Sequence, residues 1–132
     1  MKHPESPMQD RHLIAAGAIN MLIAVAAGAF VAHALKQSLS PEMLSIWHTA
    51  ANYQMMHALG LIAFGLLLPR FNQVLLKRAG LSMLIGILIF SGSLYALALT
   101  GIRILGAITP LGGVAFLLAW AMLAWVAVLH KS

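Results

Sequence analysis

The chain has 132 residues, of which 61% are hydrophobic and 8% are charged. Because a soluble domain carries about 25% charged residues, this composition excludes a water-soluble globular fold and indicates an integral membrane protein. The chain has no cysteine, which excludes disulfides, Cys-type zinc sites and thiol chemistry. Its formal net charge of +5 lies on single or paired basic residues between apolar runs, a pattern of membrane topology and not of nucleic-acid binding.

Four apolar segments are long enough to span a bilayer, because a spanning helix needs about 20 mostly apolar residues. They run from about 13–34, 47–68, 79–99 and 111–129. Runs of this length and uniformity exclude barrel strands, which alternate over about 10 residues. Residues 1–11 are polar and predict a flexible N-terminal segment. We therefore expect an all-α integral membrane protein, with one four-helix transmembrane bundle over residues 12–130.

The connections between the spans carry residues that cap helices. Ser40 precedes Pro41, which predicts a short capped helix ahead of the second span. Thr109 precedes Pro110, and this pair predicts Thr109 as the N-cap of the fourth span.

The basic residues predict the orientation. One side of the membrane receives Lys2, Arg11, Arg70, Lys77, Arg78 and Lys131, and the other receives Lys36 and Arg103. The positive-inside rule then places both termini in the cytoplasm and the protein in the inner (plasma) membrane as a multi-pass protein. The alternative is a signal peptide cleaved at Ala32-His33-Ala34. Its apolar run exceeds the usual length of about 7–15 residues, so we favour a retained span.

Polar side chains gather in the outer halves of the spans. At about 1.5 Å of rise per residue, His57 lies about 15 Å below the outer end of the second span, near the midplane. The inner half is nearly bare, with Asn20 as the main exception. This distribution predicts a polar cup that opens outward and closes near the midplane. Its candidate ligand-binding residues are His33, His48, Asn52, Tyr53, Gln54, His57, Ser91, Ser93, Tyr95 and Thr109.

Two interpretations of this polarity stay open. Ionisable groups inside a bilayer indicate a functional site, but Ser, Asn, Gln and His also serve as interhelical hydrogen-bond partners worth about 0.6–2 kcal/mol. The second span is polar nearly all round, so it should be surrounded by protein. Small-residue stripes on the first span (Ala16, Asn20, Ala24, Gly28, Ala32) and the third (Gly92, Ala96, Thr100) predict packing within the chain, with self-association as the alternative.

The six histidines do not predict a metal or haem site. No H-x-x-x-H or H-E-x-x-H spacing occurs, the spans hold no Asp or Glu, and His57 has no histidine partner at its depth. Ser91 or Ser93 beside His57 lacks a supporting acid, so we expect neither catalytic residues nor a cofactor. The missing intramembrane carboxylates also argue against a proton-coupled pump.

Four segments carry a resemblance to a known family. They are Gly28-Ala-Phe-Val-Ala-His33-Ala-Leu35, Trp47 to His57, Phe90-Ser-Gly-Ser-Leu-Tyr95 and Thr109-Pro-Leu-Gly-Gly113. In this order they resemble the small inner-membrane proteins of the YgdD type, domain of unknown function 423, over about residues 12–129. The resemblance implies a four-helix inner-membrane protein of unsettled function, with small mitochondrial relatives in animals and no assigned catalytic residues. Val31 stands where the family pattern has Gly, a departure that bears on the packing near His33.

The leading hypothesis from the sequence is a non-enzymatic membrane protein. Its cup would bind a lipid, a quinone-like molecule or a partner helix, and would support envelope integrity or the assembly of a membrane complex. The expected partners are membrane lipids and a homo-oligomeric or other membrane-protein partner. The alternative is a carrier for a small solute that uses the same pocket.

Overall fold

The computed structural model describes the backbone of residues 5–130 and the side chains of residues 10–130. All regular structure in this range is helical. Its elements are α1 (Glu5–Val25), a π-helical segment η1 (Ala26–Val31), α2 (Ala32–Leu35), α3 (Pro41–Leu67), a 3-10 turn η2 (Leu68–Arg70), α4 (Gln73–Gly86), a π-helical segment η3 (Ile87–Ser91), α5 (Gly92–Thr100) and α6 (Leu105–Leu129).

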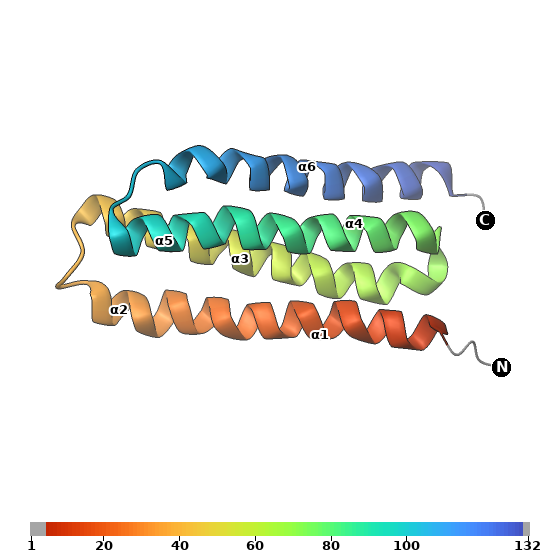
Figure 1. Ribbon diagram of the computed structural model, residues 1–132. Coiled ribbons are helices and arrows are strands. Elements are labelled where there is room, and N and C mark those ends of the chain that lie inside the picture. The colour runs from red at the N-terminus through yellow and green to blue at the C-terminus, as the bar shows by residue number, and fades with distance from the viewer. Residues whose placement is uncertain (1–4, 131–132) are drawn as a thin grey trace.

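These elements join into four rods that are long and apolar enough to cross a membrane. They comprise Asp10–Leu35, Pro41–Arg70, Gln73–Thr100 and Leu105–Leu129. The predicted all-α fold, with four helices long and apolar enough to span a membrane, is therefore confirmed over the described residues. Both ends of the chain lie at one end of the bundle, and the α2–α3 and α5–α6 connections lie at the other (Figure 1).

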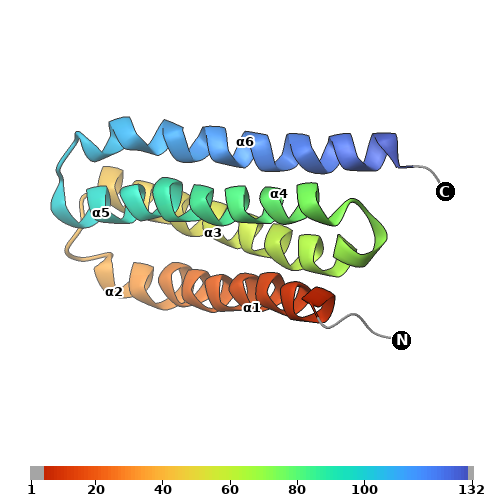
Figure 2. The ribbon, with the colours of Figure 1, turned by 45° about the vertical axis from the view of Figure 1, so that its right-hand side comes forward.

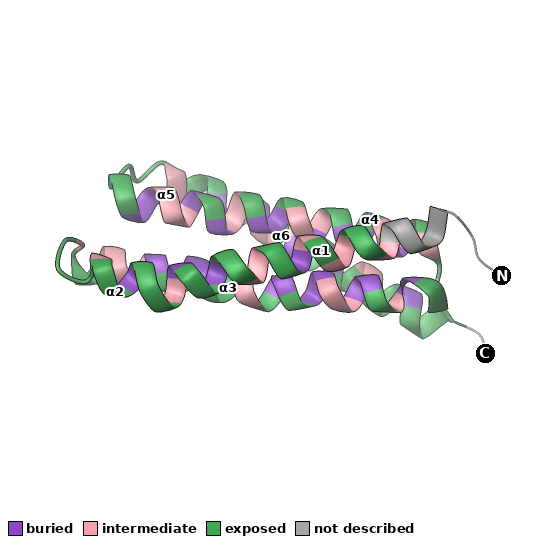
Figure 3. Ribbon diagram, turned by 90° about the horizontal axis from the view of Figure 1, so that it is seen from below, coloured by how far each residue is buried: buried purple, intermediate pink, exposed green. Residues whose placement is uncertain are grey.

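Helix α3 and the α4–α5 rod form the middle of the bundle, and α1 and α6 lie on its two outer sides (Figures 1 and 2). Helix α1 packs along α3, and α6 packs along α4, η3 and α5. Helix α1 also meets α4 where Leu13 lies against Gly80, near the end that carries the termini. Seen from its own side, α1 is exposed along much of its length, with single buried residues at intervals (Figure 3).

Helix α3 starts where the predicted cap stands. The Ser40 hydroxyl accepts a hydrogen bond from the Met43 amide at 3.2 Å, and Pro41 occupies the first turn. The short helix predicted here is continuous with the second span, since α3 runs unbroken from Pro41 to Leu67. Helix α4 likewise begins at Gln73, earlier than predicted, since Asn72 accepts from the Leu75 amide at 3.1 Å and caps it.

The predicted start of the fourth span is wrong. Helix α6 begins at Leu105, and Thr109 and Pro110 both lie inside it, so Thr109 is not an N-cap. Pro110 stands in the second turn of α6, so the helix lacks the amide that would otherwise bond the Gly106 carbonyl. Helix α1 also starts early, at Glu5, within the segment predicted to be flexible; residues 1–4 of that segment lie outside the described residues.

The half of the bundle near the termini has a dry core. Its large fully buried side chains come from α3, η2 and α4, and they are Leu61, Phe64, Leu68, Leu76 and Met83. In the other half of the bundle, Trp47 packs against small residues, Ala27, Ala51 and Ala98. A Cβ atom on Gly17 would lie 2.6 Å from the Ala58 carbonyl oxygen, so the first helix approaches α3 backbone to backbone.

Gly112 gives a sharp test of the α6 packing. A Cβ atom there would lie 2.4 Å from the Phe90 backbone nitrogen, which cannot move without shifting η3. We expect Gly112→Ala to lower the free energy of unfolding by about 1–3 kcal/mol, the usual cost of overpacking. Thermal unfolding in detergent measures the loss.

Gly113→Ala is the matched control, because its Cβ would lie 4.0 Å from the Phe90 side chain. Both substitutions introduce the same residue at neighbouring helical positions, so intrinsic helix propensity cancels. Equal effects of the two substitutions would contradict the close contact between α6 and η3.

Candidate functional site

The structure distributes the ten predicted site residues over three places and not over one cavity. Gln54, Ser91, Ser93, Tyr95 and Thr109 take part in hydrogen bonds between helices. Tyr53 and His57 belong to a layer of aromatic rings between α3 and α6. His33, His48 and Asn52 lie on the exposed surface. The described side chains contain no group of three His, Asp or Glu residues placed to hold a metal ion.

A chain of three side chains connects the first helix, α3 and α5. The Gln54 amide donates to Asn20 Oδ1 at 3.0 Å, and the Tyr95 hydroxyl donates to Gln54 Oε1 at 2.7 Å. Asn20 in turn donates to the Ala16 carbonyl at 2.9 Å. Gln54 is 5% exposed and uses both ends of its amide, so its role in this structure is to join helices.

The buried hydroxyl groups make similar links. Ser91 donates to the Ala50 carbonyl of α3 at 2.8 Å. Ser93 and Thr109 share a hydrogen bond of 2.6 Å, which joins α5 to α6. Thr109 is therefore buried between two helices, and a polar contact explains its place better than capping.

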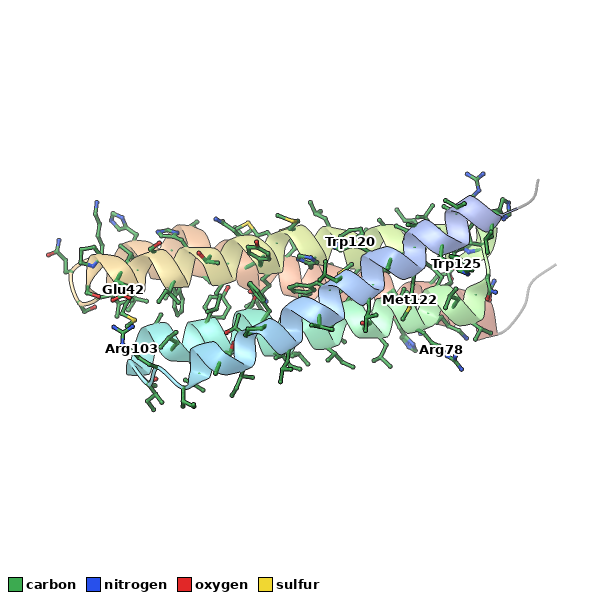
Figure 4. The ribbon with its side chains drawn as sticks, turned by 90° about the horizontal axis from the view of Figure 1, so that it is seen from above. Glu42, Arg78, Arg103, Trp120, Met122 and Trp125 are labelled. Carbon is green, nitrogen blue, oxygen red and sulfur yellow. The ribbon has the colours of Figure 1, made fainter. Side chains whose placement is uncertain are left out.

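His57 lies in the aromatic layer. Its Nδ1 atom is 2.7 Å from the Tyr53 carbonyl, and a carbonyl oxygen only accepts, so Nδ1 carries the proton. Its ring stacks on Phe116 with a centroid distance of 3.5 Å and an interplanar angle of 11°. The ring centroid of Trp120 in α6 lies 5.8 Å from that of His57, where α6 crosses α3 (Figure 4). The imidazole thus joins α3 to α6.

Trp47 makes a contact that the sequence did not reveal. Its indole Nε1 donates to the Ala27 carbonyl at 2.9 Å, inside η1. Its ring packs edge to face with the Tyr95 ring, and the two ring centroids lie 4.6 Å apart. A π-helical turn places this carbonyl where α3 can reach it, and periodicity in a sequence does not show such turns.

A lateral groove lies between the first helix and α5. Its volume is about 590 Å³, and its lining is Leu22, Ile23, Ala26, Ala27, Val31, Trp47, Gly92, Tyr95, Ala96 and Leu99. The polar atoms of Trp47 and Tyr95 are already hydrogen-bonded, so they offer ring surface to the groove. A Cβ on Gly92 would meet nothing within 4 Å. The small residues Gly92 and Ala96 of the third span therefore open the groove, contrary to the expected packing within the chain.

A second pocket lies at the rim of the bundle, near the α2–α3 connection. It has a volume of about 270 Å³ and is lined by Gly28, Ala29, Ala32, His33, Lys36, Leu44 and His48. The structure thus brings His33 and His48 together at the end of the bundle opposite the termini. This rim pocket shares no lining residue with the lateral groove.

An ion pair links the α5–α6 connection to the first turn of α3 at this end. Arg103 contacts Glu42 through its two terminal guanidinium nitrogens, at 3.2 and 3.3 Å, and the two side chains point toward each other in Figure 4. The hydrogen bond with Glu42, followed by its negative charge, raises the pKa of Arg103 above its usual value. Both side chains are well exposed, so the pair contributes little to stability.

Comparison with known proteins confirms the resemblance found in the sequence. Residues 27–113 match the family described as "Protein of unknown function (DUF423)". The UPF0382 membrane protein YwdK of Bacillus subtilis is 50% identical over 113 residues, which cover 85% of this chain and 92% of that protein. A UPF0382 membrane protein of Staphylococcus saprophyticus is 50% identical over 107 residues, covering 81% of this chain and 88% of its own length. No solved structure matches the chain.

The hydrogen bond between Tyr95 and Gln54 generates a prediction. We expect a double-mutant cycle of Tyr95→Phe and Gln54→Leu to give a coupling free energy of about 1 kcal/mol, the usual value for a polar contact between membrane helices. Unfolding in detergent measures it. The control pairs Gln54→Leu with Thr49→Val, because the Thr49 hydroxyl bonds the Ser45 carbonyl of its own helix. A coupling near zero in the first cycle would contradict the network.

Proposed function

The chain belongs to the DUF423 family of proteins of unknown function, and from this premise we propose that it is a non-enzymatic membrane protein that binds a lipid-like molecule. The binding surface is the lateral groove between the first helix and α5. Binding there would support the integrity of the membrane or the assembly of a membrane complex.

The groove itself is the observation that carries this proposal. Its lining is almost wholly apolar, and it runs beside α5 from Gly92 to Leu99, about 10 Å at 1.5 Å of rise per residue. A groove of this shape in hydrocarbon suits an acyl or isoprenoid chain, which gains contact with the Trp47 and Tyr95 rings.

The state of the polar groups supports a binding protein over an enzyme. Ser91 donates to the Ala50 carbonyl, and Ser93 shares a hydrogen bond with Thr109. Neither hydroxyl is paired with the His57 imidazole. A nucleophile needs a base within hydrogen-bond reach. These hydroxyls serve the packing of the helices.

Charge supports a location in the cytoplasmic membrane with the termini inside. The described basic residues at the end that carries the termini are Arg11, Arg70, Lys77 and Arg78, of which Arg78 is marked in Figure 4. The opposite end holds Lys36 and Arg103, and Glu42 pairs with the latter. This asymmetry follows the positive-inside rule.

Brominated lipid tests the groove. In a Trp120→Phe, Trp125→Phe background, Trp47 is the one remaining of the three tryptophans. We expect vesicles of phosphatidylcholine brominated on its acyl chain to quench Trp47 fluorescence through the groove. Gly92→Leu fills the groove and should reduce that quenching at least about twofold, because bromine quenches only near contact and the leucine side chain displaces the acyl chain.

Ala107→Leu is the control, since Ala107 is exposed on α6 and does not line the groove. Equal quenching in the Gly92→Leu variant and its parent would overturn the proposal. So would weak quenching in the parent together with a change of oligomeric mass in Gly92→Leu, because a second copy would then cover the groove.

A carrier makes a different prediction at Leu61. This side chain is fully buried in the dry core near the termini. We expect Leu61→Cys to resist a water-soluble maleimide from both faces of native vesicles, while Ser38→Cys in the exposed connection reacts. Labelling of Leu61→Cys in folded protein would favour the carrier, which has to admit water to this half during its cycle.

A further inference from the structure

Lys36 is a positive charge without a counter-ion in the described structure. It lines the rim pocket, and the carboxylate at the same end, Glu42, is committed to Arg103. A solvated lysine is ordinary on a surface. Here, however, Lys36 lines a pocket together with two histidines, His33 and His48.

The pocket is shaped to admit a small anion. Gly28, Ala29 and Ala32 form its wall on the first rod and leave room between His33 and His48. A lysine ammonium group offers only N–H donors, and an imidazole offers at least one N–H donor. No carboxylate lines the pocket. Phosphate is the anion that such a donor set recognises in a membrane.

Asn52 gives the second, independent observation. It lies on α3 one turn below His48, about 6 Å toward the midplane, and its side chain is exposed. Among the described residues it has no hydrogen-bond partner. An exposed amide without a partner in the chain is costly once it lies within a bilayer, and a polar group of a lipid at that depth would satisfy it.

Below Asn52 the same face becomes apolar. Met56 and Leu59 are 54% and 57% exposed. The face therefore presents, from the rim inward, a cationic pocket, one amide and an apolar track. A phospholipid presents the matching sequence of a phosphate, ester carbonyls and acyl chains.

We propose that the rim pocket binds the phosphate of an anionic membrane phospholipid, with its ester carbonyl on the Asn52 amide and its acyl chains along Met56 and Leu59. This site is separate from the lateral groove and goes beyond the function proposed above, because the two share no lining residue.

A second copy of the chain fits this face less well. A two-fold dimer through it would place equivalent patches against each other. Lys36 would then lie close to its own counterpart, with no acid in the pocket lining to offset the two charges. Like charges brought together in a membrane interface oppose association, whereas a lipid phosphate neutralises them.

Native mass spectrometry of the detergent-purified protein tests the proposal. We expect phosphatidylglycerol to remain bound after collisional removal of detergent, while phosphatidylcholine and inorganic phosphate do not. Lys36→Gln should weaken the phosphatidylglycerol adduct about tenfold, the loss expected for one charge-assisted hydrogen bond. Asn52→Leu should weaken it severalfold without lowering thermal stability, because a leucine suits a lipid-facing position.

Arg103→Gln is the matched control. It removes one positive charge at the same end but outside the pocket, so a general electrostatic effect would be similar in the two variants. Gly92→Leu separates the two proposals, since filling the groove should leave this adduct unchanged.

Four results would overturn the lipid site. They are equal retention of phosphatidylcholine, equal losses in Lys36→Gln and Arg103→Gln, retention of inorganic phosphate in place of lipid, and a dimer that dissociates in Asn52→Leu. If Lys36→Gln unfolds in detergent, Lys36→Met replaces it, because methionine keeps the apolar stem and removes the charge. The same outcomes then apply to Lys36→Met.

Discussion

Hydrocarbon supplies no hydrogen-bond partner, so the buried polar side chains of α3 need partners within the bundle. This requirement places α3 in the middle of the bundle. Trp47 reaches the first helix and Gln54 reaches both the first helix and α5. His57 stacks on α6. The exposed Asn52 side chain has no hydrogen-bond partner among the described residues.

The two π-helical segments lie where α3 is tied to its neighbours. In η1 the Ala27 carbonyl accepts from the Ala32 amide, five residues on, and also from the Trp47 indole. Ser91, the last residue of η3, donates to the Ala50 carbonyl of α3. Irregular turns inside spanning helices are retained when a neighbour binds their polar atoms. Both segments therefore belong to the same set of cross-links.

Hydropathy and length were sufficient to predict the four spans, and loop chemistry was sufficient to predict the Ser40 cap. Helix starts were predicted too late because helices α3, α4 and α6 continue beyond the apolar runs. Counting residues gives the depth of a side chain but not the direction in which it points. Ser91 and His57 lie at similar depth, yet one bonds α3 and the other stacks on α6.

The lateral groove lay beyond prediction for the same reason. Its two walls come from the first and third spans, which are not neighbours in the chain, and its floor is Trp47. The Gly92 stripe was visible in the sequence, but a glycine stripe allows either close packing or an open surface. Only the position of the opposite helix distinguishes them. The rim pocket was partly predictable, since a short connection brings His33 and His48 to one level.

The two halves of the bundle are closed in different ways, and this difference bears on how a ligand arrives. Large apolar side chains such as Phe64 and Met83 seal the half near the termini. Hydrogen bonds through Gln54 and Ser91 hold the other half together without filling its flanks. The lateral groove lies between the first helix and α5, on the side of the bundle, whereas the rim pocket lies near the α2–α3 connection. A molecule that enters the groove from the side comes from the bilayer, so this geometry favours a membrane-resident molecule over a water-soluble one as the proposed ligand of the groove.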